Sequence, residues 1–373
     1  YERATADEIC DYYQRVLVER FLGSGRVTFL GMHDFRGLDG DDHVAVSQLN
    51  GQATGLRVRR RLIDATYVES VVPSRHTPSF AVDPAARLLT PNQLVHHAGG
   101  SEGFTILGAG KTAMDTCVWL QEQGVDPDQI RWVRPRDGWF VDRTYTQPLD
   151  LVASMLEYQA AMFEAAVQAE SGLDLAKRME QRDMMIRLDR SVEPEVYRGA
   201  TLSRLELEQL RQIENVVRLG RVEAIGSDRI QTTEGELSTG PGVVHVDCTA
   251  PGLADSPPRP IFAEDAIRVQ LTTMGVSPWS AALIGFVETL DLSDDERNDL
   301  CPPIPRPGLI ARQLDIMAIG LGVEPKRRAN EDLARWNAAA RLNPGRSVAD
   351  HLDEPRVQAA MEAIMSNYEP ALV

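Results

Sequence analysis

The segment FTILGAGKTAMDT, residues 104–116, constrains the fold of this chain more than any other stretch. Its letters G-K-T could close a phosphate-binding P-loop, and its letters G-A-G could open a dinucleotide-binding elbow. A P-loop has the pattern G-x-x-x-x-G-K-[ST], so Gly110, Lys111 and Thr112 would require a glycine at position 105. That position holds Thr105, and the P-loop is therefore excluded.

The segment instead fills every position of a dinucleotide-binding elbow, which is a strand, the pattern G-x-G-x-x-[GA] and a helix. We predict the strand at 104–107, the helix at 114–123 and a second strand at 129–133, where a βαβ unit needs one. This context favours a nucleotide-binding elbow over a glycine turn with only a structural role. The candidate cofactor-binding residues are Gly108, Ala109, Gly110, Lys111, Thr112 and Ala113.

The residue types in the elbow explain how it would hold a dinucleotide. Gly108 permits a tight turn, Gly110 lets a pyrophosphate approach the backbone, and Ala113 lets the helix pack closely on the strand. The phosphates would face free N–H groups at the start of the helix. Lys111 would add a positive charge beside them.

The end of the second strand favours NADP over NAD. An NAD site carries Asp or Glu there for the ribose 2′-hydroxyl, whereas this chain has Arg134-Pro135-Arg136. Two guanidinium groups suit a 2′-phosphate, so we predict that Arg134 and Arg136 contribute to an NADP site. Surface arginines are common and Asp137 follows directly, so a solvated strand end is the alternative.

Charge restricts the classes of partner. Among the 373 residues, 55 are acidic and 39 are basic, which gives a formal net charge of −16. This charge disfavours phosphate backbones and anionic lipid, so we expect a small-molecule substrate rather than nucleic acid or a membrane. No membrane-span or signal-peptide pattern occurs, and we expect a cytoplasmic protein. Nothing in the sequence indicates the oligomeric state.

No residue pattern indicates a metal site or a catalytic nucleophile. The four cysteines lie far apart, the seven histidines form no H-E-x-x-H or H-x-H pattern, and no G-x-S-x-G elbow occurs. We therefore assign no catalytic residue and no metal ligand. This is expected where a cofactor carries the chemistry.

The rest of the chain is expected to form two domains, because 373 residues exceed what one core usually serves. The chain begins in a helical pattern with Thr5 as N-cap and without an initiating methionine, so we expect an upstream segment. A proline-rich connection spans 71–92. Further strands are predicted at 27–30, 43–49, 56–65, 216–225, 229–233, 243–250 and 267–271, and helices at 149–185, 203–213, 280–289, 306–320, 329–342 and 355–368.

The order of these segments resembles the flavin-containing monooxygenases and related flavoproteins with two dinucleotide-binding domains. The resemblance rests on the central elbow, the arginine after the next strand, and two turns similar to Ala-Thr-Gly, at 64–67 and 247–252. It covers most of the chain up to about residue 255. It implies an α/β fold in which a Rossmann-like NADP domain, 90–255, with a helical insertion at about 149–213, is inserted in an FAD/NAD(P)-binding-type domain. That second domain would comprise 1–89 and 256–373, with a helical C-terminus.

The resemblance also implies FAD as a second cofactor, with Ala65, Thr66 and Thr249 near the flavin. Hydride would pass from NADPH to the flavin and then to O2 or another acceptor. The glycine pattern of the family's FAD site is absent before residue 100, so either the first βαβ unit of that domain is missing from this sequence or the flavin site is lost. The monooxygenase pattern F-x-G-x-x-x-H is also absent before the elbow. A flavoprotein oxidoreductase is therefore better supported than a monooxygenase. The alternative is a dinucleotide-binding sensor that no longer holds flavin.

Overall fold

The structure is a computed structural model, and it describes residues 4–39, 42–68, 70–97, 100–253, 256–273, 275, 277–306 and 308–372. The chain forms two compact units, Tyr1–Leu62 and Ile63–Val373. These units do not coincide with the segments 1–89, 90–255 and 256–373, whose boundaries stay a prediction.

The first unit contains a helix and a small antiparallel sheet. Helix α1 (Ala6–Arg15) begins at a capping box, in which the Glu8 carboxylate accepts from the Thr5 N–H at 2.7 Å. Strands β1 (His33–Asp39), β2 (Asp42–Ser47) and β3 (Ala53–Leu56) pair in that order. The predicted strand at 27–30 is wrong, because this segment is irregular and Val27 and Phe29 are 41% and 60% exposed.

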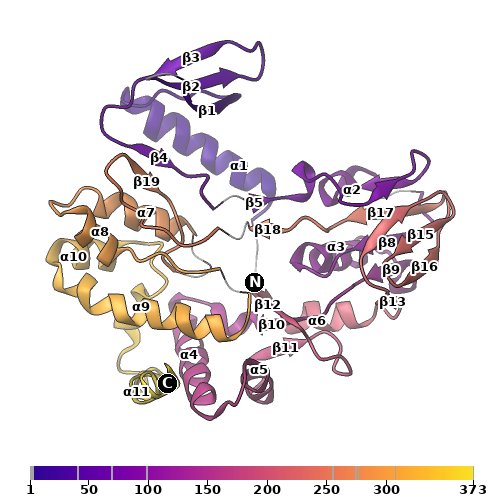
Figure 1. Cartoon of the computed structure of the whole chain (residues 1–373). Helices are drawn as coiled ribbons and strands as arrows, with labels where there is room; N and C mark the ends of the chain where they lie inside the picture. Colours follow the sequence, from indigo (N-terminus) through magenta and orange to yellow (C-terminus); the bar gives the residue numbers. More distant parts are fainter. Residues whose placement is uncertain are drawn as a thin grey trace. The chain divides into compact units, whose positions relative to one another are not determined.

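The second unit is built on a parallel sheet. Helix α3 (Lys111–Glu122) connects the strand that precedes the elbow to its neighbour. Among the described residues, the strand order is β13 (Val216–Val217), β9 (Ile130–Val133), β8 (Gly103–Leu107), β17 (Val243–Asp247) and β7 (Arg87–Leu89) (Figure 1). Since β9 and β17 flank β8, the strand order reverses at β8, which is where ligands bind in open parallel sheets. The expected α/β class with a Rossmann-like parallel sheet is confirmed.

The two faces of the parallel sheet are covered by different elements, because its side chains alternate between faces. Ile106 and Trp132, both fully buried, belong to the cluster formed with α3 and α6 (Arg204–Arg211). Leu107 and Val133 belong to the opposite cluster. That cluster lies against a second sheet of β16 (Gly235–Ser238), β15 (Arg229–Thr232), β14 (Val222–Ile225) and β6 (Ala81–Val82). Burial of both faces explains why β8 and β17 are mostly apolar, and it also covers their polar residues Thr105 and His245.

A subdomain separates β9 from β13 along the chain. Strand β10 (Gly138–Asp142) pairs antiparallel with β11 (Met185–Arg187) and parallel with β12 (Val196–Leu202). Helices α4 (Val152–Gln168) and α5 (Gly172–Gln181) bury Met162 and Met179 in the core of this subdomain. The helices lie within the insertion predicted at about 149–213, which also holds β11 and β12, two strands that the sequence pattern did not predict.

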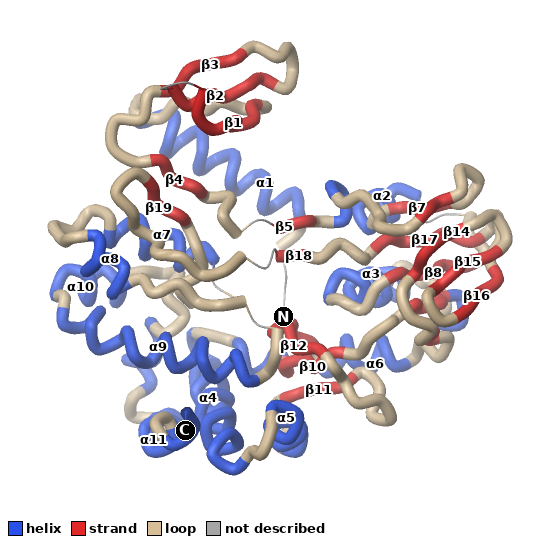
Figure 2. Tube along the Cα trace, in the orientation of Figure 1, coloured by secondary structure: helices blue, strands red, loops and turns tan. Residues whose placement is uncertain are grey.

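Helices make up most of the C-terminal region (Figure 2). They are α7 (Ser277–Val287), α8 (Asp294–Leu300), α9 (Ala311–Ala329), α10 (Glu331–Ala339) and α11 (Pro355–Asn367). Helix α11 packs on α4 through a cluster that contains Val357 and Phe163, and Trp279 of α7 belongs to a separate core. The helices predicted near 280, 306, 329 and 355 are confirmed. Within the described ranges, no helix has both the length and the apolar character needed to cross a membrane.

Short strands join the segments that follow the two predicted turns. Strand β5 (Ser70–Val71) pairs antiparallel with β18 (Gly252–Leu253). Helix α2 (Pro91–His97) lies between β7 and β8 in the chain, and β4 (Leu62–Asp64) is linked to β19 (Ala266–Arg268) in a two-stranded sheet. The segments after residues 67 and 250 therefore run side by side.

Candidate functional site

The elbow begins with a glycine that no other residue could replace without strain. Gly108 has a φ of 122°, which residues with a Cβ rarely adopt. A Cβ at this position would lie 2.6 Å from the carbonyl oxygen of Cys248. The Gly108 N–H donates to Val133 O at 3.0 Å, and its carbonyl accepts from Trp132 Nε1 at 2.7 Å. Gly108 thus makes a tight turn that joins the ends of β8, β9 and β17.

The second glycine faces open space. Gly110 is the N-cap of α3, with a φ of −87° and a ψ of 177°, and no side chain hydrogen-bonds to cap this helix. A Cβ built on Gly110 would meet no other atom within 4 Å. Beside it, Ala109 is half-buried and Thr112 is exposed, whereas Ala113 is fully buried against the sheet. The uncapped start of a helix beside an open surface favours an anion.

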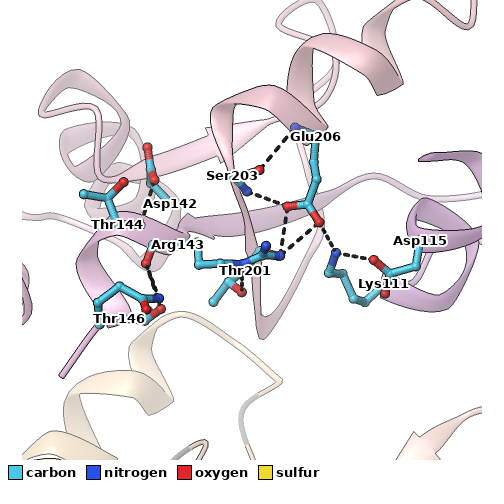
Figure 3. A network of polar contacts seen from close by, with 10 residues as sticks. Lys111, Asp115, Asp142, Arg143, Thr144, Thr146, Thr201, Ser203 and Glu206 are labelled. Carbon is cyan, nitrogen blue, oxygen red and sulfur yellow. Dashed lines mark hydrogen bonds and ion pairs between the residues drawn. The ribbon is translucent and has the colours of Figure 1, made fainter. Parts of the chain in front are cut away.

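Lys111 lies at the elbow but is held by two carboxylates. Its Nζ is 2.6 Å from Asp115 Oδ1 and 3.1 Å from Glu206 Oε1 (Figure 3). Glu206 also contacts Arg143 Nη2 at 2.8 Å and accepts from the Ser203 N–H at 2.7 Å. The network therefore anchors α6 and the start of α3 to each other. Much of the positive charge predicted for Lys111 is balanced locally, and its contact with a phosphate stays a prediction.

Glu206 is a site residue that the sequence reasoning missed. Burial opposes its ionisation, but the Ser203 N–H and the charges of Lys111 and Arg143 lower its pKa to about 2. Ser203 and Glu206 form a capping box at the start of α6. The spacing S-x-x-E at 203–206 is a visible signal for this box, although not for the contact with Lys111.

The two arginines after β9 differ in exposure. Arg134 has a side chain only 4% exposed, with Nη2 3.0 Å from Asp137 Oδ1 and its guanidinium 4.8 Å from the centre of the Trp132 ring. Burial, the largest effect, lowers the pKa of Arg134, while the Asp137 carboxylate opposes this shift. Arg136 is exposed. Of the predicted pair, Arg136 is thus the guanidinium that faces solvent, and a cofactor role for either stays a prediction.

The two turns singled out in the sequence share one hydrogen-bond pattern. Asp247 Oδ1 accepts from the Thr249 N–H at 2.9 Å and from its hydroxyl at 2.6 Å. Asp64 Oδ1 accepts from the Thr66 N–H at 2.9 Å and from its hydroxyl at 2.8 Å. Ala65, between the two, is exposed. The similarity of the turns is therefore structural, whereas the proximity of Ala65, Thr66 and Thr249 to a flavin is untested.

A histidine far away in the sequence reaches the second turn. His76 Nε2 lies 3.5 Å from the Thr249 hydroxyl, a long contact between residues 173 positions apart. No local sequence pattern could have predicted it. In the described part of the chain, no group of three or more His, Cys, Asp or Glu side chains could hold a metal ion.

Together these residues form a site along the carboxyl edge of the parallel sheet. The elbow from Gly108 to Ala113 follows β8, Arg136 follows β9, and Thr249 follows β17. Since β9 and β17 flank β8, an extended ligand centred on the elbow could contact all three strand ends. Ala65 and Thr66 are connected to this edge through the pairing of β5 with β18 and through the hydrogen bond from the Ser256 hydroxyl to Tyr67 O.

Comparisons with known proteins give a family without an assigned activity. No family model matches the chain. Over all 373 residues it is 36% identical to the uncharacterized protein Rv2000 of Mycobacterium tuberculosis and to the uncharacterized protein Mb2023 of Mycobacterium bovis, and it covers 68% of each. The water-forming NADH oxidase from Lactobacillus brevis, solved bound to NADH, is 12% identical with a TM-score of 0.28, over 58% of this chain and 36% of that one. This last likeness is too weak to support a function. The 36% identity to the mycobacterial proteins shows that this chain belongs to their family.

Proposed function

We propose that the chain binds a nicotinamide dinucleotide across the carboxyl edge of its parallel sheet. The observation that carries this proposal is Gly110, which caps α3 without a side chain and has open space above it. The pyrophosphate would lie at this position and accept from the first N–H groups of α3. The tight turn at Gly108, which brings β8, β9 and β17 together beneath the ligand, gives further support.

The proposed activity is that of an NADPH-dependent oxidoreductase with a small-molecule substrate. When bound, NADPH supplies a hydride, and the protein supplies orientation and electrostatics. Arg136 supports the preference for NADPH, because its exposed guanidinium follows β9, where the adenosine ribose would lie. Thr249 and Asp247 at the end of β17 would orient the other half of the dinucleotide.

FAD is proposed as a second cofactor on the resemblance alone. The matched turns at Asp64 and Asp247 fit the crossings that this resemblance implies. The chain has no second G-x-G-x-x-G elbow, so the residues present do not make up a site for the FAD pyrophosphate. We therefore derive no step through the flavin. Because residues 1–373 hold no such elbow, the second candidate function is a dinucleotide-binding sensor without flavin.

Titration of NADPH and NADH into the chain, with and without FAD, tests the proposal. Energy transfer from tryptophan to the reduced nicotinamide would report binding, and Trp132, which donates its Nε1–H to Gly108 O, lies beside the elbow. We expect saturable binding that the Gly110→Ala substitution weakens by about tenfold or more, since a methyl group there keeps the pyrophosphate from the backbone. Flavin bleaching with NADPH would support the oxidoreductase, and binding without bleaching would support the sensor. Absence of binding by both nucleotides would refute the dinucleotide site.

A further inference from the structure

Two arginines converge on one carbonyl group just beyond the end of β17. Pro251 O accepts from Arg198 Nη1 at 3.5 Å and from Arg306 Nη2 at 3.3 Å. Arg198 lies on β12 and Arg306 lies in the segment before α9, so residues far apart in sequence meet here. Both hydrogen bonds are long, and a guanidinium has five donors, so contacts within the described residues use little of the donor capacity of this pair.

The convergence is electrostatically unfavourable without an anion. Partial burial lowers the pKa of Arg198, and the charges of Arg306 and Arg136 lower it further. Arg198 and Arg136 are exposed and Arg306 is half-buried. Within the described ranges, none of the three forms an ion pair with a carboxylate. Arg198 and Arg306, whose side chains share the Pro251 carbonyl, thus bring two guanidinium groups together in a chain whose formal net charge is −16.

The location of this arginine cluster connects it with the elbow. Arg136 follows β9, and Pro251 lies four residues after the last residue of β17, Asp247. These two strands flank β8, which leads into Gly108 and Gly110. The cluster therefore lies at the same carboxyl edge as the proposed dinucleotide site. Arg198 belongs to the inserted subdomain and Arg306 to the C-terminal region, and neither residue is part of the elbow pattern.

We propose that Arg198 and Arg306 form a binding site for a phosphate group of a small molecule. Arginine suits this role, because its planar fork of donors matches phosphate oxygens and it stays charged when partly buried. The phosphate has two sources within this chemistry, the 2′-phosphate of the dinucleotide or a second, phosphorylated ligand. The first source rests on the proposed function, and the second does not. Arg134, which is buried against Asp137, takes no part.

The test compares the double variant Arg198→Gln and Arg306→Gln with the wild type and with Arg341→Gln. Arg341 is an exposed arginine outside the cluster and serves as the matched control. The probes are NADPH, NADH and inorganic phosphate, each followed by titration calorimetry and by the thermal shift of the full chain. Among the described residues, both target side chains hydrogen-bond only to one carbonyl, and both bonds are long. The variant is therefore expected to fold, and circular dichroism verifies this.

The expected result is a loss of about tenfold or more in affinity in the double variant alone, since charge-assisted hydrogen bonds to phosphate are strong. If the affinity for NADPH falls and the affinity for NADH does not, the ligand is the 2′-phosphate. If only the affinity for inorganic phosphate falls, the ligand is a second phosphorylated molecule. Unchanged affinity for all three probes in the double variant would overturn the proposal. If the wild type binds neither nucleotide, the dinucleotide proposal fails. The titration with inorganic phosphate then tests by itself whether the arginines bind phosphate.

Discussion

Two single-methyl substitutions in the elbow are expected to impair different properties, stability at Gly108 and NADPH affinity at Gly110. Gly108→Ala places a Cβ 2.6 Å from Cys248 O, at a φ of 122°. Strain of this kind costs about 1–3 kcal/mol from the backbone alone, and relief of the clash requires β8 and β17 to move apart. We expect a loss of about 3 kcal/mol in the free energy of unfolding. Gly110→Ala meets no atom within 4 Å at a φ of −87°, so we expect a change of less than about 1 kcal/mol.

Urea unfolding followed by circular dichroism measures both values, and NADPH titration measures binding by the same variants. Gly110→Ala is expected to keep the stability of the wild type and to lose affinity, which separates ligand approach from folding. Gly108→Ala is expected to lose stability first. Equal stability of both variants would refute the strain assigned to Gly108. Unimpaired NADPH binding by Gly110→Ala would refute the position assigned to the pyrophosphate.

Three further predictions concern the packing around the site. Glu206→Gln is expected to lower the free energy of unfolding by about 2 kcal/mol at pH 7, because Lys111 and Arg143 lose a carboxylate partner. The difference in stability from the wild type is expected to shrink as the pH falls below 4.5 toward the Glu206 pKa of about 2. Burial lowers the pKa of His245 to about 4, so the folded state gains its proton later than the unfolded chain as the pH falls. Stability is then lost between pH 6.5 and 4, by about 2 kcal/mol at pH 5, and His245→Gln is expected to remove this slope in urea unfolding at each pH. Cys10 is exposed, whereas burial raises the pKa of Cys117, Cys248 and Cys301. A thiol reagent is therefore expected to modify only one cysteine rapidly in the folded chain. A second fast-reacting thiol would contradict the burial of the other three.

The elbow could be predicted because its signal is local. Gly108 is required by a positive φ, Gly110 by an open helix start, and Ala113 by close packing, all within six residues of one another. The C-terminal helices were predicted for a similar reason, since helical periodicity is also a property of neighbouring residues. Their observed bounds differ from the predicted ones by up to nine residues, at the C-terminal end of α9.

Other features depend on contacts between distant segments. Strand β11 has only three residues, and strand β12 contains Gly199, which weakens the strand pattern in the sequence. Strand β12 pairs with β10, about sixty residues earlier in the chain. The contact of His76 with Thr249 joins residues 173 positions apart. The segment 27–30 is apolar but finds no partner strand, so its composition alone was misleading.

The sequence around Arg134 is compatible with a buried arginine as well as with the predicted phosphate ligand. Residues two apart on a strand share a face, so Trp132 and Arg134 lie together, and Asp137 is close enough in sequence to pair with the guanidinium. An arginine at the end of this strand can bind a phosphate, or it can stabilise the end of the strand by pairing with a carboxylate. Only the location of the Asp137 carboxylate, which also holds Arg218 at 3.0 Å, distinguishes the two.

The most direct test of the dinucleotide site is a TROSY NMR titration of the isotope-labelled chain with NADPH, following the backbone amides. We expect the largest, saturable shifts at Ala109, Gly110, Lys111 and Thr112, because their N–H groups would face the pyrophosphate at the start of α3. Saturation with shifts confined to other elements, or no shifts at millimolar NADPH, would contradict the site and leave residues 108–113 as a structural turn.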